Sequence, residues 1–404
     1  MLDQPAPMSL DDLSSFGIDA ERGFLPTQDP LRELPARFAG WEEIAGDMGK
    51  LIVAGWLRQA IDDMALLSIP EASDVRALRR AMMVLSYLGH GYMWSGGDLT
   101  RGIPVAIAVP WHQAAARLGR PPVLSYASYA LDNWGRIDPD GPIEIENLTI
   151  LQNFLGGADE DWFILIHVDI EARAAPAIRA IPGALEAAAR RDADGLEARL
   201  EDIEASLAAM NTTMRRMPEY CDPYVYFHRV RPYIHGWKDN PAVPNGVIYQ
   251  GVEAYGGAAQ KFRGETGAQS GIIPAIDAAL GVAHQRDELR VYLMEMREYM
   301  PPGHRAFVEE IERRSALRSF VRGPGGCRKS LKSVYDGCLR RVEEFRSIHL
   351  EFAARYIFHQ AEGNRTNPNS VGTGGTPFMP YLKKHRDETC DGVVATDGAG
   401  KARP

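Results

Sequence analysis

The sequence predicts an all-α protein, and three observations support this. The longest patterned stretches place apolar residues at alternating steps of three and four, the spacing of one buried helix face. No hairpin alternation or strand–helix–strand succession is apparent, which argues against a sheet protein. Thr266 to Gln269 matches a capping box, and Pro274 is tolerated in a first turn, so a helix is predicted to begin near Ser270.

Length and turn signals divide the chain into two helical domains. A chain of 404 residues is long for one core. The densest turn cluster of the first half is DPDGP, at residues 138–142. We therefore predict a small N-terminal domain over residues 1–143 and a larger one over residues 144–404.

In the first domain, an irregular arm over residues 1–30 precedes the helical patterns. These patterns cover residues 51–67, 74–88, 104–118 and 126–134. The glycines of GHGYMWSGGD, at residues 89–98, are expected to end the second helix. The fourth helix carries Tyr126 and Tyr129 three residues apart, hence on one face.

The larger domain opens with the apolar run DWFILIHVDI, at residues 161–170. The Ala-rich sequence that follows it, with charges at helical spacing, favours a buried helix over a strand. Further helices are predicted at residues 183–217, 287–298, 303–318 and 330–358. Glu/Arg pairs at spacings of three and four over 183–217 indicate a solvated face.

The last of these helices carries a histidine on its apolar stripe. Phe345 and Phe352 on this stripe are seven residues apart, and His349 lies between them at the position where the next apolar residue is expected. The apolar positions are Leu331, Tyr335, Cys338, Val342, Phe345, Phe352 and Tyr356. Periodicity alone leaves two interpretations open: a core histidine bonded to a neighbour, or an axial ligand of haem in an apolar pocket.

Composition excludes several classes of protein. A net charge of -9 and a pI near 5.7 argue against nucleic-acid binding. No apolar run approaches the ~20 residues that span a bilayer, and the acidic N-terminus does not resemble a signal peptide. The cysteines lie far apart without a CxxC motif, which indicates reduced thiols in a cytoplasm and excludes zinc-ribbon and covalent-haem proteins. They are Cys221, Cys327, Cys338 and Cys390.

FRSIHLEFAARYI (345–357) and GTGGTPFMPYLKKHR (372–386) resemble the C-terminal part of the indoleamine 2,3-dioxygenase family. The resemblance runs in the family's order through five further segments, at residues 91–110, 121–134, 231–241, 264–281 and 296–307. It implies that His349 is the proximal ligand of haem b. It further implies that Arg346 and Asp277 pair to orient the haem edge, although an ordinary helix–helix salt bridge is the alternative. Thr266 and Gly267 match positions lining the distal side near the propionates.

The same resemblance implies a substrate site. Arg231 matches the arginine that binds the substrate carboxylate, with a buried structural ion pair as the alternative. The glycine-rich loop at residues 359–376 would close over the substrate through Thr373 and Gly374, or be a surface connector. Four aromatic side chains would contact the indole, namely Tyr126, Phe163, Tyr226 and Phe227.

Two positions depart from the typical animal enzymes, which carry serine at His167 and phenylalanine at Tyr226. A distal histidine is similar to the tryptophan 2,3-dioxygenase family, where an imidazole contacts the indole N–H. His167 and Phe163 are four residues apart on a helix, so both can face one pocket. The alternative is a surface or core histidine that points away from haem.

The resemblance implies a cytoplasmic haem b dioxygenase of tryptophan catabolism, the kynurenine pathway. It would insert both atoms of O2 across the C2–C3 bond of L-tryptophan or a related indole, giving an N-formylkynurenine-type product. His167, Arg231 and Thr373 would be the catalytic residues. Its partners would be the substrate, O2 and an electron donor that keeps iron ferrous, without nucleic acid or membrane. The alternatives are a haem monooxygenase or tailoring enzyme on another aromatic, and a non-enzymatic haem sensor or carrier.

Overall fold

The computed structural model describes residues 10–362 except 11, 97, 100–101, 283–287 and 327, together with residues 383–384 and 386–389. Within these residues the protein is helical apart from one small antiparallel sheet. In this sheet β1 (Gly135–Arg136) pairs with β2 (Leu148–Thr149), Gly135 lying opposite Thr149. The prediction of an all-α protein is confirmed.

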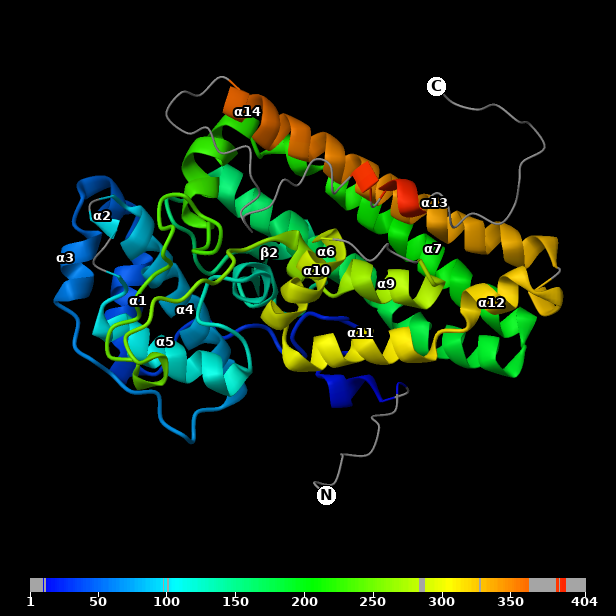
Figure 1. The fold of residues 1–404 in the computed structure, drawn as a ribbon, viewed down its shortest axis with the longest axis horizontal. Helices are drawn as coiled ribbons and strands as arrows, with labels where there is room; N and C mark the ends of the chain where they lie inside the picture. Colours follow the sequence, from blue (N-terminus) through cyan, green and yellow to red (C-terminus); the bar gives the residue numbers. More distant parts are fainter. Residues whose placement is uncertain are drawn as a thin grey trace.

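Five helices from the first part of the chain gather at one end of the molecule (Figure 1). They are α1 (Ala39–Gly46), α2 (Met48–Ala54), α3 (Leu57–Asp62), α4 (Val75–Trp94) and α5 (Val105–Leu118). The single helix predicted at 51–67 was wrong, because Gly55 adopts φ 74° and ends α2.

The predicted end of α4 at the glycines was also wrong. The helix continues through GHGYMW to Trp94. A Cβ on Gly89 would lie 2.3 Å from Cζ3 of Trp111 on α5. The glycine therefore serves close helix packing, and the buried contact outweighs the weak helix propensity of this residue.

Three long helices run lengthwise beside one another and form the larger part of the molecule (Figure 1). They are α6 (Ala158–Arg190), α7 (Ala193–Arg215) and α13 (Lys329–Ala353). The predicted buried helix at 161–170 is confirmed as part of α6. The continuous helix predicted at 183–217 was wrong: Arg191 adopts φ 59°, and the Asp192 side chain accepts from the Gly195 N–H at 2.9 Å. That cap starts α7.

The remaining α-helices are shorter. They are α8 (Pro223–Val225), α9 (Ile272–Leu280), α10 (Glu288–Met296), α11 (Pro302–Arg314), α12 (Leu317–Arg322) and α14 (His359–Glu362). Thr266 caps the 3-10 turn Gly267–Gln269 that precedes α9, and not α9 itself. The helix predicted at 303–318 is divided, because Ser315 leaves the helical conformation between α11 and α12.

The proposed boundary between residues 143 and 144 is crossed by contacts in both directions. The N-terminal arm packs on α11, where the ring centroids of Phe16 and Phe307 lie 5.5 Å apart. In return, the segment after α8 reaches back to the first helices, where the Ile103 N–H donates to the Ile248 carbonyl at 2.8 Å. One continuous apolar core joins both parts. The two-domain division remains a proposal.

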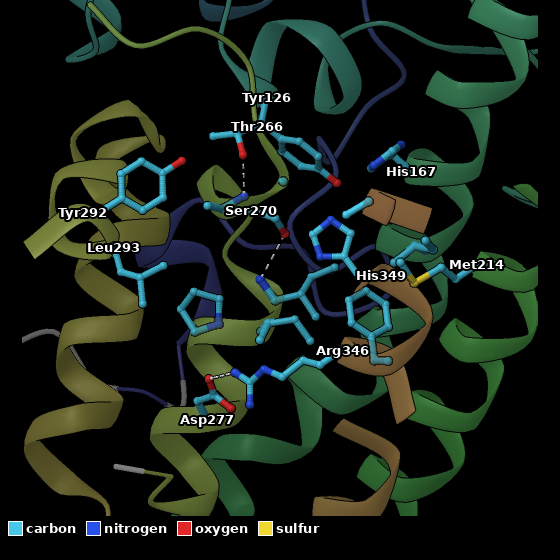
Figure 2. A pocket seen from close by; sticks show the side chains of 18 of the residues that line it. Tyr126, His167, Met214, Thr266, Ser270, Asp277, Tyr292, Leu293, Arg346 and His349 are labelled. Atoms are coloured by element: carbon cyan, nitrogen blue, oxygen red, sulfur yellow. Dashed lines mark hydrogen bonds and ion pairs between the residues drawn. The ribbon is translucent and has the colours of Figure 1, made fainter. Parts of the chain in front are cut away.

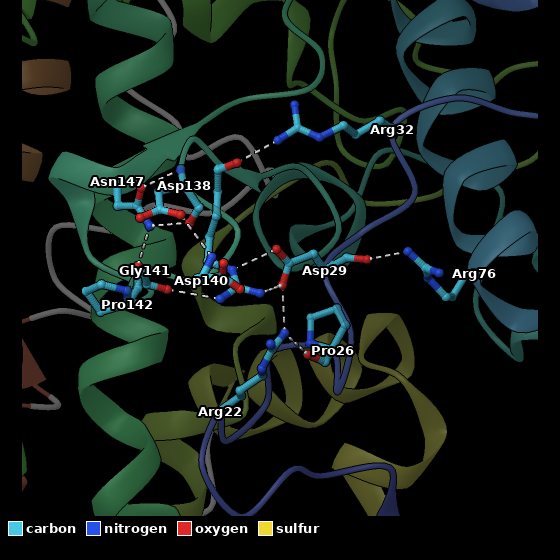
Figure 3. A network of polar contacts seen from close by, with 11 residues as sticks. Arg22, Pro26, Asp29, Arg32, Arg76, Asp138, Asp140, Gly141, Pro142 and Asn147 are labelled. Atoms are coloured by element: carbon cyan, nitrogen blue, oxygen red, sulfur yellow. Dashed lines mark hydrogen bonds and ion pairs between the residues drawn. The ribbon is translucent and has the colours of Figure 1, made fainter.

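Asp29 ties the N-terminal arm to the turn that contains β1 (Figure 3). Its carboxylate accepts from Arg136 Nε at 2.8 Å and from Arg22 Nη1 at 2.9 Å. Arg136 also donates to the Gly141 carbonyl at 2.9 Å. Burial of Asp29 favours the neutral acid, but the hydrogen bonds and charges of Arg136 and Arg22 outweigh it and lower the pKa of the carboxyl.

Replacing Asp29 with asparagine is expected to lower the free energy of unfolding by about 1 to 2 kcal/mol at neutral pH. Because the folded-state pKa is depressed, this stabilisation is present above the unfolded pKa and is lost as pH falls through the folded value. Denaturant unfolding at pH 7 and in acid measures the difference. Asp47→Asn, which breaks an exposed pair with Lys50, is the control and should change little. Equal losses in both variants would contradict the role of Asp29.

Candidate functional site

A cavity of about 700 Å³ lies between α6, α9, α10 and α13. Its walls are mainly apolar and aromatic, and include Ile170, Met214, Ile273, Leu289, Leu293, Phe345, Phe352 and Ile357. Among the polar residues, Tyr126, Thr266 and Ser270 stand together and Arg346 and Asp277 stand together, with His349 between the two groups (Figure 2). Arg290, Arg297 and Glu312 also line the cavity. The cavity combines an apolar interior with few polar groups, as small-molecule and cofactor sites do.

His349 opens into this cavity from α13. The apolar stripe predicted for the helix is confirmed, since Leu331, Tyr335, Cys338 and Val342 are buried. His349 lines the cavity, and its ring is accessible there. Burial, and then the nearby His167, lower its pKa to about 4. The imidazole is therefore neutral at physiological pH, as a metal ligand must be.

His167 enters the same cavity from α6. Its Nδ1 lies 2.7 Å from the Phe163 carbonyl oxygen. A carbonyl can only accept, so Nδ1 carries the proton and Nε2 is left as an acceptor in the neutral ring. Burial lowers the pKa of His167, which favours this neutral form. Its ring contacts those of Phe163 and Tyr126, with centroids 4.6 and 5.9 Å away.

Arg346 and Asp277 form a buried ion pair on the cavity wall. The Arg346 Nη2 lies 2.5 Å from Asp277 Oδ2, and both residues are 6% exposed. Arg346 also donates to the hydroxyl of the buried Thr389. The sequence predicted the pair, but no local pattern pointed to Thr389. Arg346 stands one turn before His349 on α13, so the ion pair fixes a charge close to the imidazole.

Three predicted aromatic residues lie together on the wall near His167. Tyr126, Phe163 and Tyr226 all line the cavity, and the rings of Phe163 and Tyr226 lie 4.6 Å apart. Phe227 is fully buried and is not part of the lining.

Arg231 is likewise fully buried and is not part of the lining, with its guanidinium carbon 5.4 Å from the centroid of the Phe227 ring. Burial lowers its pKa to about 10, and the nearby Tyr226 acts in the opposite direction. The guanidinium is therefore charged at physiological pH.

Two predicted distal residues, Thr266 and Gly267, also line the cavity. Next to them the Ser270 hydroxyl donates to Glu171 Oε1 at 2.8 Å. Glu171 is 1% exposed, and burial raises its pKa to about 7, against hydrogen bonds from Ser270 and Tyr126. Glu171 was not among the residues predicted from the sequence, although its position four residues after His167 on one helix was a usable signal. Ser270 and Glu265 were not predicted either, and no local signal points to them.

The loop residues Thr373 and Gly374 lie outside the described residues, as do Cys327 and Cys390. Cys221 and Cys338 are buried free thiols. Across the described ranges, no helix is long and apolar enough to cross a bilayer. Nor do three or more histidine, cysteine or carboxylate side chains gather there as a metal site.

The donor set at the cavity fits haem. The porphyrin supplies four nitrogen ligands to the iron, and the protein supplies an axial ligand and an apolar pocket. The cavity offers that arrangement, with His349 as a neutral imidazole amid apolar walls. By fold and site, the chain is an all-α protein with a cavity suited to haem.

The family model described as Indoleamine 2,3-dioxygenase matches residues 12–392. The chain is 35% identical to indoleamine 2,3-dioxygenase 2 of Homo sapiens, over 97% of both chains. It is 36% identical to indoleamine 2,3-dioxygenase 1 of Rattus norvegicus, over 95% of this chain and 96% of the relative. For the indoleamine 2,3-dioxygenase of Saccharomyces cerevisiae the identity is 31%, over 93% and 92%. The chain belongs to the indoleamine 2,3-dioxygenase family, whose members are haem-dependent oxidoreductases that incorporate O2.

Proposed function

We propose that the protein binds haem b on His349 and adds both atoms of O2 across the C2–C3 bond of L-tryptophan or a related indole. The observation that carries this proposal is the neutral imidazole of His349 opening into a large apolar cavity. The product would be of the N-formylkynurenine type, as in tryptophan catabolism. The haem supplies the O2 chemistry, which side chains cannot perform.

The test is to incubate the ferrous, haem-loaded protein with L-tryptophan and O2, following product absorbance and mass. A product that carries two added oxygen atoms supports the proposal. Absence of turnover with L-tryptophan and with other indoles would contradict it.

The side chains around the cavity bind and orient the cofactor and the substrate. Arg346 and Asp277 hold a fixed charge pair one turn from His349, where they can orient the haem edge. Thr266 and Gly267 line the side that would receive the propionates. His167, whose ring centroid lies 5.9 Å from that of Tyr126, would face the substrate.

The residues proposed to contact the substrate are aromatic side chains together with one charged side chain. Phe163 and Tyr226 offer a flat apolar surface to an indole ring, with Tyr126 close to them. Arg231, whose charge interacts with Tyr226, would supply the positive charge for a carboxylate. Thr373 and Gly374, outside the described residues, would close over the substrate and exclude water.

His167→Ser is expected to reduce discrimination between L-tryptophan and its N1-methyl analogue. In the parent protein, Nε2 of His167 is the acceptor that can take the indole N–H. Losing that hydrogen bond should narrow the ratio of the two kcat/KM values by about tenfold, while haem stays bound. The measurement is kcat/KM for both substrates in parent and variant. An unchanged ratio would show that His167 does not contact the indole nitrogen.

A second candidate function is a monooxygenase or tailoring reaction on another aromatic compound. The observation in its favour is that His167 and Tyr226 place polar groups among the aromatic residues. These groups suit a substrate with additional hydroxyl or amine groups. A product with a single added oxygen atom would favour this function over dioxygenation.

We place the reaction in the cytoplasm, where the buried thiols Cys221 and Cys338 stay reduced. Burial raises the pKa of both, so neither is a reactive thiolate. An electron donor is needed there to return ferric iron to the ferrous state.

A further inference from the structure

Glu171 lies one turn after His167 on α6, so the two side chains are neighbours on one side of the helix. Glu171 is 1% exposed and is not part of the cavity lining, whereas His167 lines the cavity. Its carboxyl joins α6 to the segment before α9, because Oε1 accepts from the Ser270 hydroxyl at 2.8 Å. The Ser270 oxygen in turn accepts from the Ile272 N–H at 3.3 Å, in the first turn of α9.

Tyr126 belongs to the same cluster through its backbone and its hydroxyl. Its N–H donates to Oε1 of Gln269, the residue before Ser270, at 2.9 Å. Its hydroxyl lies close enough to the Glu171 carboxyl to hydrogen-bond with it, and this contact opposes the effect of burial on the pKa of Glu171. Tyr126 is therefore held at both ends by the groups around Glu171.

The Tyr126 ring connects this cluster to His167. Their ring centroids lie 5.9 Å apart with an interplanar angle of 72°, an edge-to-face contact. Figure 2 shows the two side chains next to each other on the cavity. The tilt of the imidazole therefore depends on where the Tyr126 ring is held.

Glu171 has fewer hydrogen bonds to stabilise a negative charge than Glu160, which is also 1% exposed and lies on the same helix. Glu160 accepts from the backbone N–H groups of residues 154–156 at 2.7, 3.2 and 3.1 Å. Oε2 of Glu171 accepts no hydrogen bond within the described part of the chain. The charge of Glu171 thus depends on the hydroxyls of Ser270 and Tyr126.

We propose that Glu171 is a positioning residue for His167: it holds the Tyr126 hydroxyl, and through the Tyr126 ring it fixes the orientation of the imidazole. The inference rests on the proposed function, in which His167 faces the substrate, and Glu171 itself touches neither substrate nor cofactor. Charge-assisted hydrogen bonds are stronger than neutral ones, so Glu171 holds Tyr126 most firmly when it is ionised.

This role makes the orientation of His167 depend on pH. Burial raises the pKa of Glu171 to about 7, against hydrogen bonds from Ser270 and Tyr126. The carboxylate predominates above this value and the neutral acid below it, so the restraint strengthens as pH rises through about 7. Burial lowers the pKa of His167, so its ring is mainly neutral across this range.

The other titratable groups of the cluster are Tyr126 and Glu265. Burial, and then the charge of Glu171, raise the pKa of Tyr126, so its phenol stays neutral. Glu265 also acts on the Tyr126 phenol, and burial raises the pKa of Glu265 to about 8. In a Glu265→Gln variant the transition near pH 7 should therefore persist.

The experiment observes His167 by NMR in the full-length, haem-loaded ferrous protein with CO bound and histidine isotopically labelled. The Nδ1–H that donates to the Phe163 carbonyl gives the resonance, assigned by its loss in His167→Ser. In the parent it is expected to shift with a midpoint near pH 7. In Glu171→Gln it should not depend on pH. Tyr126→Phe, alone or combined with Glu171→Gln, should behave like Glu171→Gln, because all three break the same contact.

The ratio of kcat/KM for L-tryptophan to that for its N1-methyl analogue is a second readout. Both substrates carry the same α-amino and carboxylate groups, so the titration of those groups cancels in the ratio. From about pH 6 to about pH 8 the ratio should rise about threefold in the parent. In Glu171→Gln it should stay at the low-pH value.

Glu160→Gln is the matched control. Burial also raises the pKa of Glu160 to about 7, but Glu160 binds backbone N–H groups and does not line the cavity. This variant should keep the pH dependence of both readouts. Haem content and the Tm are measured for every variant. If Glu171→Gln does not retain haem, Tyr126→Phe takes its place, because it removes the same hydrogen bond.

The outcomes separate this inference from the proposed function. A His167 resonance that is independent of pH in the parent, or that titrates in Glu171→Gln as in the parent, overturns the positioning role. A parent that oxidises no indole contradicts the proposed function alone, since the resonance still reports on Glu171. A resonance that responds as expected beside an unchanged ratio supports the positioning of the ring and shows that His167 does not contact the indole nitrogen.

Discussion

Replacing His349 with alanine is expected to abolish stoichiometric haem binding. His349 is the imidazole that α13 directs into the cavity, and its low pKa keeps it neutral and able to bind iron. The apolar walls contribute contacts with the porphyrin but cannot replace an axial ligand. Haem content of the purified variant, from absorbance in alkaline pyridine, measures the loss.

Two controls accompany this variant. His112→Ala removes a histidine on α5 that does not line the cavity, and it should retain full haem. Free imidazole added to His349→Ala should restore part of the haem spectrum, because the cavity left by the side chain can admit a small ligand. A His349→Ala protein with full haem and an unchanged ferric spectrum would show that another residue is the ligand.

Arg231→Ala is expected to weaken L-tryptophan binding by about 2 to 4 kcal/mol. The guanidinium is fully buried but still charged, since burial lowers its pKa only to about 10. Without it, a substrate carboxylate would be desolvated with no opposite charge. Binding of L-tryptophan to the haem-loaded protein, followed by absorbance, gives the change in Kd.

The matched control is Arg229→Ala, which removes an exposed arginine two residues earlier. It should bind L-tryptophan like the parent. Arg231→Ala is expected to keep its haem, because Arg231 is not among the residues proposed to hold the cofactor, which are His349, Arg346, Asp277, Thr266 and Gly267. If Arg231→Ala binds and turns over L-tryptophan normally, the carboxylate is bound elsewhere.

The spacing of apolar residues predicted where most helices lie, but it did not predict where several of them end. The three-four stripe predicted α13 and put His349 on its inner face, and the structure confirms both. The predicted end of α4 came too early, because no local pattern shows that Gly89 packs against Trp111 of another helix. The helix pattern also predicted α6 and α7 as one continuous helix, because the N-cap residue Asp192 lies within a charged sequence that has helical spacing throughout.

The sequence by itself determined the helical class, the histidine on the buried stripe and the family, because periodicity and the order of motifs are properties of the chain alone. Only the tertiary structure decided which polar groups share the cavity. Glu171 and Ser270 lie 99 residues apart yet meet at 2.8 Å, and Arg346 and Asp277 lie 69 apart yet meet at 2.5 Å. Burial of the His167 ring was decided in the same way, whereas its tautomer follows from the Phe163 carbonyl four residues earlier on the same helix. Such meetings depend on how whole helices pack, and no local repeat in the sequence encodes that packing.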